Sequence, residues 1–396
     1  MNVLVLNAGS SSLKLRLFEI TGASSFVKAL ARGAIERIGG RGTATFAPEG
    51  APPRSETVEV PDHADAARQA LEWVRSLDQG VIHAVGHRVV HGGERFTAPA
   101  RIDDEVVSAV GKLEELAPLH NRPSLQAIGA CRRLLGPSVP MVAVFDTAFH
   151  TTLPEHARHY AIPWDLASKH GIRRYGFHGT SYRSVLSRYA EITGTPPERA
   201  TLIALHLGAG CSAAAIRAGQ SVDTSMGFTP LEGLVMGTRA GDLDPAIVSY
   251  LARAERTSAE EVVQWLNDRS GLLGISGRSR DVRDLLSSDD PRARLAIQMF
   301  CYRARKYLGA YLAALGGAEA VVFTGGIGEH SPEVRAEICS GMEWCGLAID
   351  PERNRAAVGR EAMIGAVGAR IGAFVIPADE EIVIARDTVA CLEGRG

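Results

Sequence analysis

Residues 1–20 read MNVLVLNAGSSSLKLRLFEI and carry the strongest fold signal in the chain. An apolar run over residues 3–6 leads into six small polar residues, and apolar and basic residues then alternate over residues 13–17. The apolar run is typical of a buried strand, and the alternation is typical of a strand with one buried face. The stretch therefore predicts a β-hairpin whose turn is built from Asn, Ala, Gly and Ser.

The composition of the 396-residue chain predicts a soluble globular enzyme with more than one domain. Hydrophobic residues make up 45% and charged residues 22%, and the net charge of -2 gives no broad field for nucleic acid or an anionic membrane. We expect no membrane-spanning helix and no signal peptide, because the apolar runs are short and residues 1–5 lack basic side chains. The six cysteines form no CxxC pair, which predicts reduced thiols in the cytoplasm.

Apolar runs and helical spacing alternate through the first part of the chain. The predicted helices cover 62–77, 103–116 and 123–135, and the predicted buried strands cover 81–85 and 139–145. This alternation is typical of an α/β protein whose sheets are covered on both faces.

The strand, small-residue turn and strand of the opening recur at 201–216, as TLIALHL, GAGCS and AAAI. Similarity of this kind predicts an internal duplication, and two related α/β domains would leave a cleft for a small ligand. A third glycine-rich segment, GGIGE, occupies 325–329. The remaining predicted elements are a helix over 291–315, a strand over 373–377 and a helix over 381–392.

Three glycine-rich turns follow buried strands, around Gly9, Gly208 and Gly326. Glycine lets the backbone approach a phosphate closely, and the backbone N–H groups can then donate to the anion. One such turn alone is most simply a tight turn, whereas three favour a polyphosphate site between domains. None of them matches a P-loop or a dinucleotide-binding fingerprint.

Four polar residues stand beside glycines or at the ends of apolar runs: Arg88, Asp146, His178 and Arg239. An arginine fork suits a carboxylate or phosphate, and a histidine before a helix N-terminus suits an anion. Each residue could instead have a purely structural role. The arginines could form surface ion pairs, Asp146 could be a cap or turn residue, and His178 could be a structural histidine with its hydrogen bonds made inside the fold. The remaining histidines considered lack the spacing of a transition-metal site: His87, His91, His120 and His206.

Five motifs, NAGSSSLK, GHRVVHGG, RYGFHGTS, LEGLVMGTRAGDLDP and FTGGIGE, occur in this order. Together they make the chain resemble the acetate kinase (acetokinase) family over almost its whole length. The resemblance implies two duplicated ribonuclease H-like, actin-like ATPase domains with an ATP cleft between them. It also implies a first domain of 1–146 with 383–396, reached by a returning C-terminal helix, and a second domain of 147–382.

The same resemblance implies reversible transfer of the ATP γ-phosphoryl group to acetate, giving acetyl phosphate and ADP. It implies Mg²⁺, for which Mn²⁺ can substitute, and a cytoplasmic homodimer with acetate and ATP as its small-molecule substrates. An already ionised acetate needs no general base, so cations and positioning carry most of the catalysis.

The family pattern also assigns roles to individual residues. The implied catalytic residues are Arg88, Asp146, His178 and Arg239. The implied substrate-binding residues are Arg88, Val90, Leu119, Phe177 and Pro230. The implied nucleotide-binding residues are Lys14, His206, Leu207, Gly208, Ala209, Gly210, Asp281, Val282, Arg283, Gly326, Ile327, Gly328, Glu329 and His330. The implied metal-binding residues are Asn7 and Glu380.

The chain departs from the family pattern at positions that include Ala209, His330, Tyr182 and Asp379. Asp379 could add a negative charge on the metal side. Three alternatives stay open beside acetate kinase: propionate kinase of the same family, an ATPase of the superfamily, and a nucleotide-binding protein with weakened catalysis. Val90 favours acetate because a β-branched side chain narrows the pocket, although one methylene is worth only about 1–3 kcal/mol.

Overall fold

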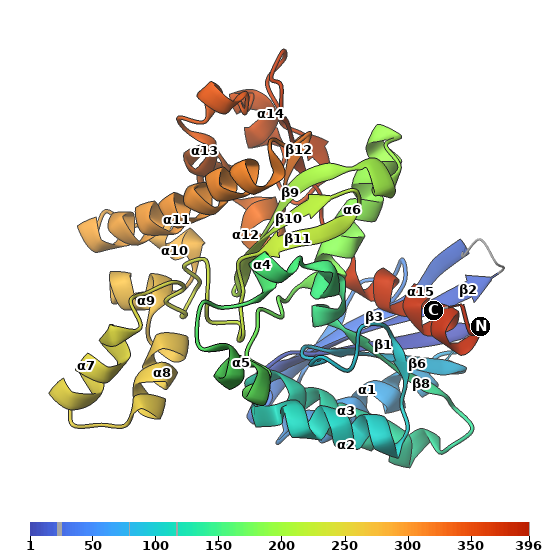
Figure 1. The fold of residues 1–396 in the computed structure, drawn as a ribbon. Coiled ribbons are helices and arrows are strands. Elements are labelled where there is room, and N and C mark those ends of the chain that lie inside the picture. The colour runs from blue at the N-terminus through green and yellow to red at the C-terminus, as the bar shows by residue number, and fades with distance from the viewer. Residues whose placement is uncertain (22–25, 79, 116–117, 396) are drawn as a thin grey trace. The chain divides into compact units, whose positions relative to one another are not determined.

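The computed structural model describes residues 1–21, 26–78, 80–115 and 118–395, with the backbone alone at 115 and 118–120. The chain divides into two compact units (Figure 1). Unit 1 comprises Met1–Phe149 and Asp379–Gly396, and unit 2 comprises His150–Ala378. The domain ranges implied by the resemblance break the chain a few residues away, after 146 and 382, and they stay a prediction for the functional domains.

Unit 1 is built on an eight-stranded sheet in the order β5-β4-β3-β2-β1-β6-β8-β7. Its strands are β1 (Asn2–Ala8), β2 (Ser12–Thr21), β3 (Phe26–Glu36), β4 (Gly40–Pro48), β5 (Arg54–Val60), β6 (Ala84–Val89), β7 (Ala100–Arg101) and β8 (Met141–Phe145). Its helices are α1 (His63–Arg75), α2 (Asp104–Lys112), α3 (Pro118–Leu135) and α15 (Glu380–Leu392). The predicted opening hairpin is confirmed, with β1 and β2 antiparallel and Asn7 opposite Lys14.

The apolar run of β1 is buried because both faces of the sheet are covered. Leu4 and Leu6 pack into a core that includes side chains of α1 and α3. Val3 and Val5 point to the other face and pack against Ile384 and neighbouring residues of α15. Successive side chains of a strand alternate between faces, so a strand between two helical layers is apolar throughout.

Unit 2 is built on a six-stranded sheet in the order β11-β10-β9-β12-β14-β13. Its strands are β9 (Thr201–Leu207), β10 (Cys211–Arg217), β11 (Gln220–Thr224), β12 (Ala320–Thr324), β13 (Ala362–Met363) and β14 (Gly372–Val375). Its helices are α4 (Glu155–Arg158), α5 (Trp164–His170), α6 (Gly179–Thr193), α7 (Ala246–Ala254), α8 (Ala259–Asp268), α9 (Gly271–Ser276), α10 (Val282–Leu286), α11 (Pro291–Leu315), α12 (Gly325–His330), α13 (Pro332–Cys339) and α14 (Pro351–Ala356).

The two sheets share one topology, which supports the predicted duplication. The strands β3-β2-β1-β6-β8-β7 of unit 1 correspond in order to β11-β10-β9-β12-β14-β13 of unit 2. In both series the first two pairings are antiparallel, the next two are parallel and the last is antiparallel. Strands β4 and β5 extend the sheet of unit 1 beyond this shared part. The predicted α/β fold with two related sheets is therefore confirmed.

Helix boundaries follow local capping chemistry where the sequence supplies it. Asp62, the first residue of the predicted helix, caps α1 by accepting from the Asp65 N–H. The 25-residue α11 begins with Asp290 as cap and Pro291 in its first turn, and it ends at Gly316 with φ 70°. All six cysteines are free thiols, as expected.

Several predicted boundaries are wrong for identifiable reasons. The strand predicted from Val81 begins at Ala84, where pairing with β1 starts, and Val81 is 63% exposed. Helix α3 begins at Pro118 and contains Pro123, which was predicted to be its first residue. The segment after β12 turns directly into α12, so the third glycine-rich turn is the first turn of a helix. Helical hydrogen bonds and strand pairing set these limits, and neither depends on hydrophobicity alone.

Candidate active site

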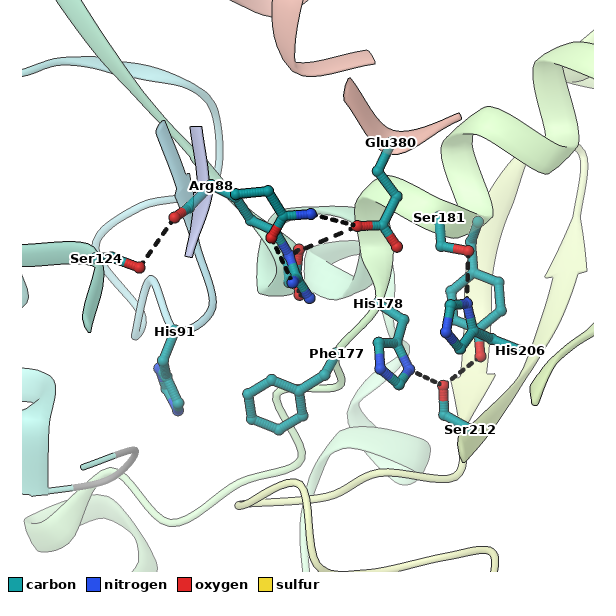
Figure 2. A network of polar contacts seen from close by, with 12 residues as sticks. Arg88, His91, Ser124, Phe177, His178, Ser181, His206, Ser212 and Glu380 are labelled. Carbon is teal, nitrogen blue, oxygen red and sulfur yellow. Dashed lines mark hydrogen bonds and ion pairs between the residues drawn. The ribbon is translucent and has the colours of Figure 1, made fainter. Parts of the chain in front are cut away.

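Arg88 is the centre of a polar cluster in unit 1 (Figure 2). It lies near the end of β6 and donates through Nε and Nη2 to Asp146, with a shortest distance of 2.5 Å. Its Nη1 donates to Asn7 Oδ1 at 3.0 Å, and Glu380 Oε2 lies 3.8 Å from its Nε. The parallel strands β1, β6 and β8 end at the same edge of the sheet, so their register brings these side chains together.

Glu380 reaches the cluster as the first residue of α15, where Asn7 Nδ2 donates to its Oε2 at 3.4 Å. The preceding Asp379 caps the helix by accepting from the Ile382 N–H at 3.1 Å. Asp379 also forms an ion pair with Arg16 at 2.6 Å. The Asp379 carboxylate thus has a helix N–H and Arg16 as partners, and its effect on a metal ion stays a prediction.

The charges of this cluster do not balance. Burial raises the pKa of Glu380; Arg88 lowers it and Asp146 raises it, and the net shift is upward. Burial opposes the charge on Arg88, but Asp146 and Glu380 more than offset this and raise its pKa. One guanidinium thus lies between the buried carboxylate of Asp146 and the partly buried carboxylate of Glu380, and an added cation would relieve their repulsion.

The donor atoms of the cluster fit Mg²⁺ in their chemistry. Asn7 and Glu380, the predicted metal residues, offer amide and carboxylate oxygens, which hard divalent cations prefer. Across the described ranges, no group of three or more His, Cys, Asp or Glu side chains is arranged to hold a metal ion. Mg²⁺ at Asn7 and Glu380 would thus need oxygens from substrate phosphate or water as well.

Helix α1 supports the turn of the opening hairpin through a hydrogen bond from His63. The Gly9 N–H donates to the Ser12 carbonyl at 2.8 Å, and His63 Nε2 donates to the Gly9 carbonyl at 2.7 Å. A Cβ at Gly9 would lie 3.1 Å from the Ser12 hydroxyl, so the turn has little room for a side chain. The predicted phosphate ligand Lys14 follows on β2 and lines a cavity of about 340 Å³ with Arg16, Arg32 and other residues.

His178 is the centre of a second cluster, which lies in unit 2 (Figure 2). It caps α6 with φ 60°, a left-handed conformation that is uncommon for residues other than glycine. Its Nδ1 lies 2.8 Å from the Ser212 hydroxyl, and its ring stacks on His206 with centroids 4.1 Å apart. His206 Nδ1 in turn lies 2.8 Å from the Ser181 hydroxyl. The prediction that His178 precedes a helix is confirmed.

Arg239 lies beside the same turn of unit 2. Its Nη1 donates to the Pro230 carbonyl at 3.2 Å, and burial lowers the pKa of its guanidinium. A Cβ built on Gly210 would lie 3.6 Å from Arg239 Nη1 and 3.6 Å from His178 Nε2. Unit 2 therefore brings the predicted residues His178, Gly210 and Arg239 into one place.

The predicted nucleotide residues of the β9–β10 turn adjoin two other segments of unit 2. A Cβ on Gly208 would lie 3.9 Å from the Gly326 backbone nitrogen. The Gly237 N–H donates to the Ala209 carbonyl at 3.3 Å, and a Cβ on Gly237 would lie 3.5 Å from the Arg280 Cβ. The structure thus groups 206–210 with 326 and with the residue before Asp281.

Several side chains in these segments have structural partners. Glu329 accepts from the Gly325 N–H at 2.9 Å within α12, and His330 Nδ1 lies 3.1 Å from the Gly326 carbonyl. Asp281 caps α10 and pairs with Arg283, whose side chain is 89% exposed. Val282 is buried. The backbone of these segments is therefore a better candidate than most of their side chains for binding a nucleotide.

The predicted methyl-pocket residues are divided between the units. Val90 is buried in unit 1, and Phe177 and Pro230 are buried in unit 2. The side chain of Leu119 lies outside the described residues. The pocket itself stays a prediction.

Ser212 and Ser181 were not predicted as site residues. The β9–β10 hairpin has a turn of three residues, 208–210, which places Ser212 opposite His206. The repeat of the opening motif at 201–216 could therefore have predicted that Ser212 lies near His206. The sequence marks Tyr182 only as a departure from the family pattern, although helical spacing places it one turn after His178.

In the part of the chain that the structure covers, no helix is long and apolar enough to cross a membrane. The acetokinase family model matches residues 2–386. The acetate kinase of Solibacter usitatus is 53% identical over 100% of this chain and 99% of its own length. The structure of Porphyromonas gingivalis acetate kinase has a TM-score of 0.88 at 41% identity, covering 99% of each chain. A propionate kinase structure from Francisella tularensis has a TM-score of 0.90 at 38% identity, covering 98% of this chain and 99% of its own.

The fold, the order of the motifs and these likenesses agree with one another. The predicted family is confirmed, and the predicted activity agrees with the names of relatives about half identical over their full length. From these matches along nearly all of its length, the chain belongs to the acetokinase family.

Proposed function

We propose that this chain is an acetate kinase that transfers the γ-phosphoryl group of ATP reversibly to acetate, with Mg²⁺. The observation that carries the proposal is the largely buried cluster of Arg88, Asp146 and Asn7, at the ends of three parallel strands, with Glu380 from the start of α15. This cluster combines a fixed guanidinium with oxygen donors for a cation, which transfer between anionic groups requires.

Arg88 binds an anion in this proposal, and Asp146 orients it. Among the described residues, Arg88 uses one N–H of each of its three nitrogens. Nε and Nη2 donate to Asp146, and Nη1 donates to Asn7. A guanidinium has five N–H donors, so two are left to bind a carboxylate or phosphoryl oxygen. Because Asp146 is fully buried and holds the fork, the guanidinium has one orientation before substrate binds.

Asn7 and Glu380 hold the magnesium ion in this proposal. Bound Mg²⁺ would neutralise charge on the phosphate oxygens. The raised pKa of Glu380 is consistent with this role, because a cation beside it would favour the ionised carboxylate.

His178 and Arg239 act on the transferring phosphoryl group in this proposal. Both side chains flank the Gly210 backbone, where a donor and a cation can share one oxyanion. The lowered pKa of Arg239 results from burial, and a bound anion would compensate for that desolvation. Lys14 and the backbone of residues 206–210, 281–283 and 326–330 bind the nucleotide, and Val90, Leu119, Phe177 and Pro230 enclose the methyl group.

The identity of the phosphoryl acceptor needs a separate test, because proteins similar to this chain include both acetate kinases and a propionate kinase. Relatives named acetate kinase and a structure named propionate kinase resemble this chain closely. The buried, β-branched Val90 favours acetate. An extra methylene costs only about 1–3 kcal/mol in such a pocket, so we expect measurable turnover of propionate.

We also propose that the chain acts as a homodimer in the cytoplasm. Leu295, Met299 and Tyr302 form an exposed stripe on one face of α11, with 47%, 41% and 60% of their surfaces exposed. Tyr250 on α7 is 64% exposed. An exposed apolar stripe on a long helix is typical of a surface that a second copy covers. A reduced compartment suits the free cysteines.

The decisive experiment measures ADP and trapped acyl hydroxamate from Mg-ATP with acetate, propionate, butyrate or no acid. We expect turnover that depends on acid, is fastest with acetate and yields one hydroxamate per ADP. ATP hydrolysis without acid would favour the ATPase alternative. Nucleotide binding without turnover would favour the catalytically weakened protein, and faster turnover of propionate would favour propionate kinase.

A further inference from the structure

A buried hydroxyl chain runs behind His178 in unit 2. Tyr182 is fully buried in the first turn of α6, and its hydroxyl lies 2.5 Å from Ser212 Oγ. Ser212 is also fully buried, on β10, and its Oγ lies 2.8 Å from His178 Nδ1. The order of contacts is therefore Tyr182, Ser212, His178.

The contacts fit a chain in which each hydroxyl donates toward His178. Burial raises the pKa of Tyr182 above its usual value, so the phenol keeps its proton. The His206 backbone hydrogen-bonds the phenol oxygen, and in this direction of the chain the phenol donates its own hydrogen to Ser212 Oγ. A serine hydroxyl carries one hydrogen, and Ser212 then donates it to His178 Nδ1.

This direction determines the tautomer of His178. A ring nitrogen that accepts a hydrogen bond carries no proton, so the proton of the neutral imidazole lies on Nε2. Nε2 is the atom beside Gly210 and Arg239, where the transferring phosphoryl group is proposed to bind. A second proton on Nδ1 would reverse the Ser212 hydroxyl and leave two donors facing each other.

We propose that Tyr182 and Ser212 are positioning residues that hold His178 as the neutral tautomer with its proton on Nε2. The proposal rests on the proposed phosphoryl transfer for its kinetic consequence, but the tautomer itself does not depend on turnover. The Nε2–H then donates to a phosphoryl oxygen without reorientation at the moment of reaction.

Other contacts of His178 fit a ring whose orientation matters. The left-handed backbone at His178 is costly for a residue with a side chain and is typical of functional positions. The stacked ring of His206, itself held by Ser181, limits rotation about the side-chain bonds. The Arg239 cation beside Nε2 also opposes a positive charge on the imidazole.

The first test compares Tyr182→Phe with Tyr189→Phe, the same change at another buried tyrosine of α6. For Tyr182→Phe we expect kcat to fall about 10-fold, with the KM values for acetate and ATP changed less than twofold. We also expect the low-pH limb of the kcat profile to move to higher pH, because Nδ1 can then accept a proton. Tyr189→Phe should leave kcat and the profile unchanged. Equal behaviour of the two variants would overturn the proposal.

The second test asks whether the hydroxyl chain acts through His178. Ser212→Ala should lower kcat like Tyr182→Phe, the double variant should be no worse than Ser212→Ala, and Ser212→Thr should retain most activity. In a His178→Ala background, Tyr182→Phe should have no further effect. A loss of equal size in that background would show a general structural role and contradict the proposal.

The third test needs no activity and separates this proposal from the proposed function. Long-range ¹H–¹⁵N spectra of histidine-labelled protein, assigned with His178→Gln, report which ring nitrogen carries the proton. We expect a proton on Nε2 alone in the natural sequence and a mixture of tautomers in Tyr182→Phe. A proton on Nδ1 in the natural sequence would refute the proposed chain, whether or not acetate is phosphorylated.

Discussion

At the scale of single residues, Arg88 combines a proposed catalytic role with a structural one. It is the positive partner of Asp146, which is fully buried. Removing one partner of such a pair leaves an uncompensated charge and costs about 3–5 kcal/mol of stability. Loss of the guanidinium should also weaken transition-state stabilisation by about 2–4 kcal/mol.

We expect Arg88→Gln to lower kcat/KM for acetate about 10²- to 10³-fold and to lower the melting temperature. Arg88→Lys keeps the charge but not the fork, so it should restore stability more than activity. Arg41→Gln, at an exposed arginine on β4, is the control and should change both little. Coupled kinetics and thermal unfolding measure the two effects. Full activity of Arg88→Gln would contradict the assignment.

His87 precedes Arg88 and should make stability depend on pH. Burial lowers the pKa of His87 to about 3, and its Nε2 has no hydrogen-bond partner among the described residues. Below about pH 6.5 the unfolded chain binds a proton at this residue and the folded chain does not. The free energy of unfolding should therefore be highest above pH 6.5 and fall by about 1.4 kcal/mol per unit as the pH decreases toward 3.

Chemical denaturation at pH 7 and pH 5 should show this loss, about 2 kcal/mol from His87, in the natural sequence. The pH dependence should be correspondingly smaller in His87→Leu. His83→Leu is the control, because His83 is exposed on the segment before the same strand. Identical pH dependence in His87→Leu and the natural sequence would show that His87 is protonated in the folded state.

At the scale of elements, the N-terminus of α15 tests how a helix cap supports the site. Asp379 accepts from the Ile382 N–H and pairs with Arg16, and Glu380 follows it. Asparagine also caps helices well, whereas alanine does not. The ion pair is partly exposed and contributes little, so the cap should be the larger contribution.

We expect Asp379→Asn to lower the free energy of unfolding by less than 1 kcal/mol and Asp379→Ala to lower it by about 1–2 kcal/mol. The Mg²⁺ concentration for half-maximal activity should be unchanged in Asp379→Asn. Asp62→Ala, at the α1 cap, provides a comparison away from Glu380. A several-fold higher Mg²⁺ requirement in Asp379→Asn would show that its charge serves the metal.

At the scale of the whole molecule, the exposed stripe on α11 predicts self-association. A charge placed at its most exposed residue should disfavour burial against a second copy. We expect Tyr302→Glu to shift the protein from dimer to monomer in analytical ultracentrifugation, with little change in folded secondary structure. Trp344→Glu is the control, because Trp344 is 77% exposed on another segment. A dimer that survives Tyr302→Glu would place the interface elsewhere.

The sequence by itself determined the elements whose signals are local. The opening hairpin, the Asp62 cap of α1, the span of α11 and the duplicated hairpin at 201–216 follow from periodicity, capping residues and glycine turns within a few residues. The order of the motifs was enough for the family. Local chemistry is sufficient here because helices and hairpins close their hydrogen bonds over short separations.

Only the tertiary structure decided which side chains meet. Asn7 contacts Glu380 from the opposite end of the chain, and Asp146 accepts hydrogen bonds from the guanidinium of Arg88. Ser212 reaches His178 because β10 packs beside the start of α6, and Asp379 serves Arg16 and its helix. These contacts depend on strand register and helix packing between distant segments, and a single sequence contains no local signal for them.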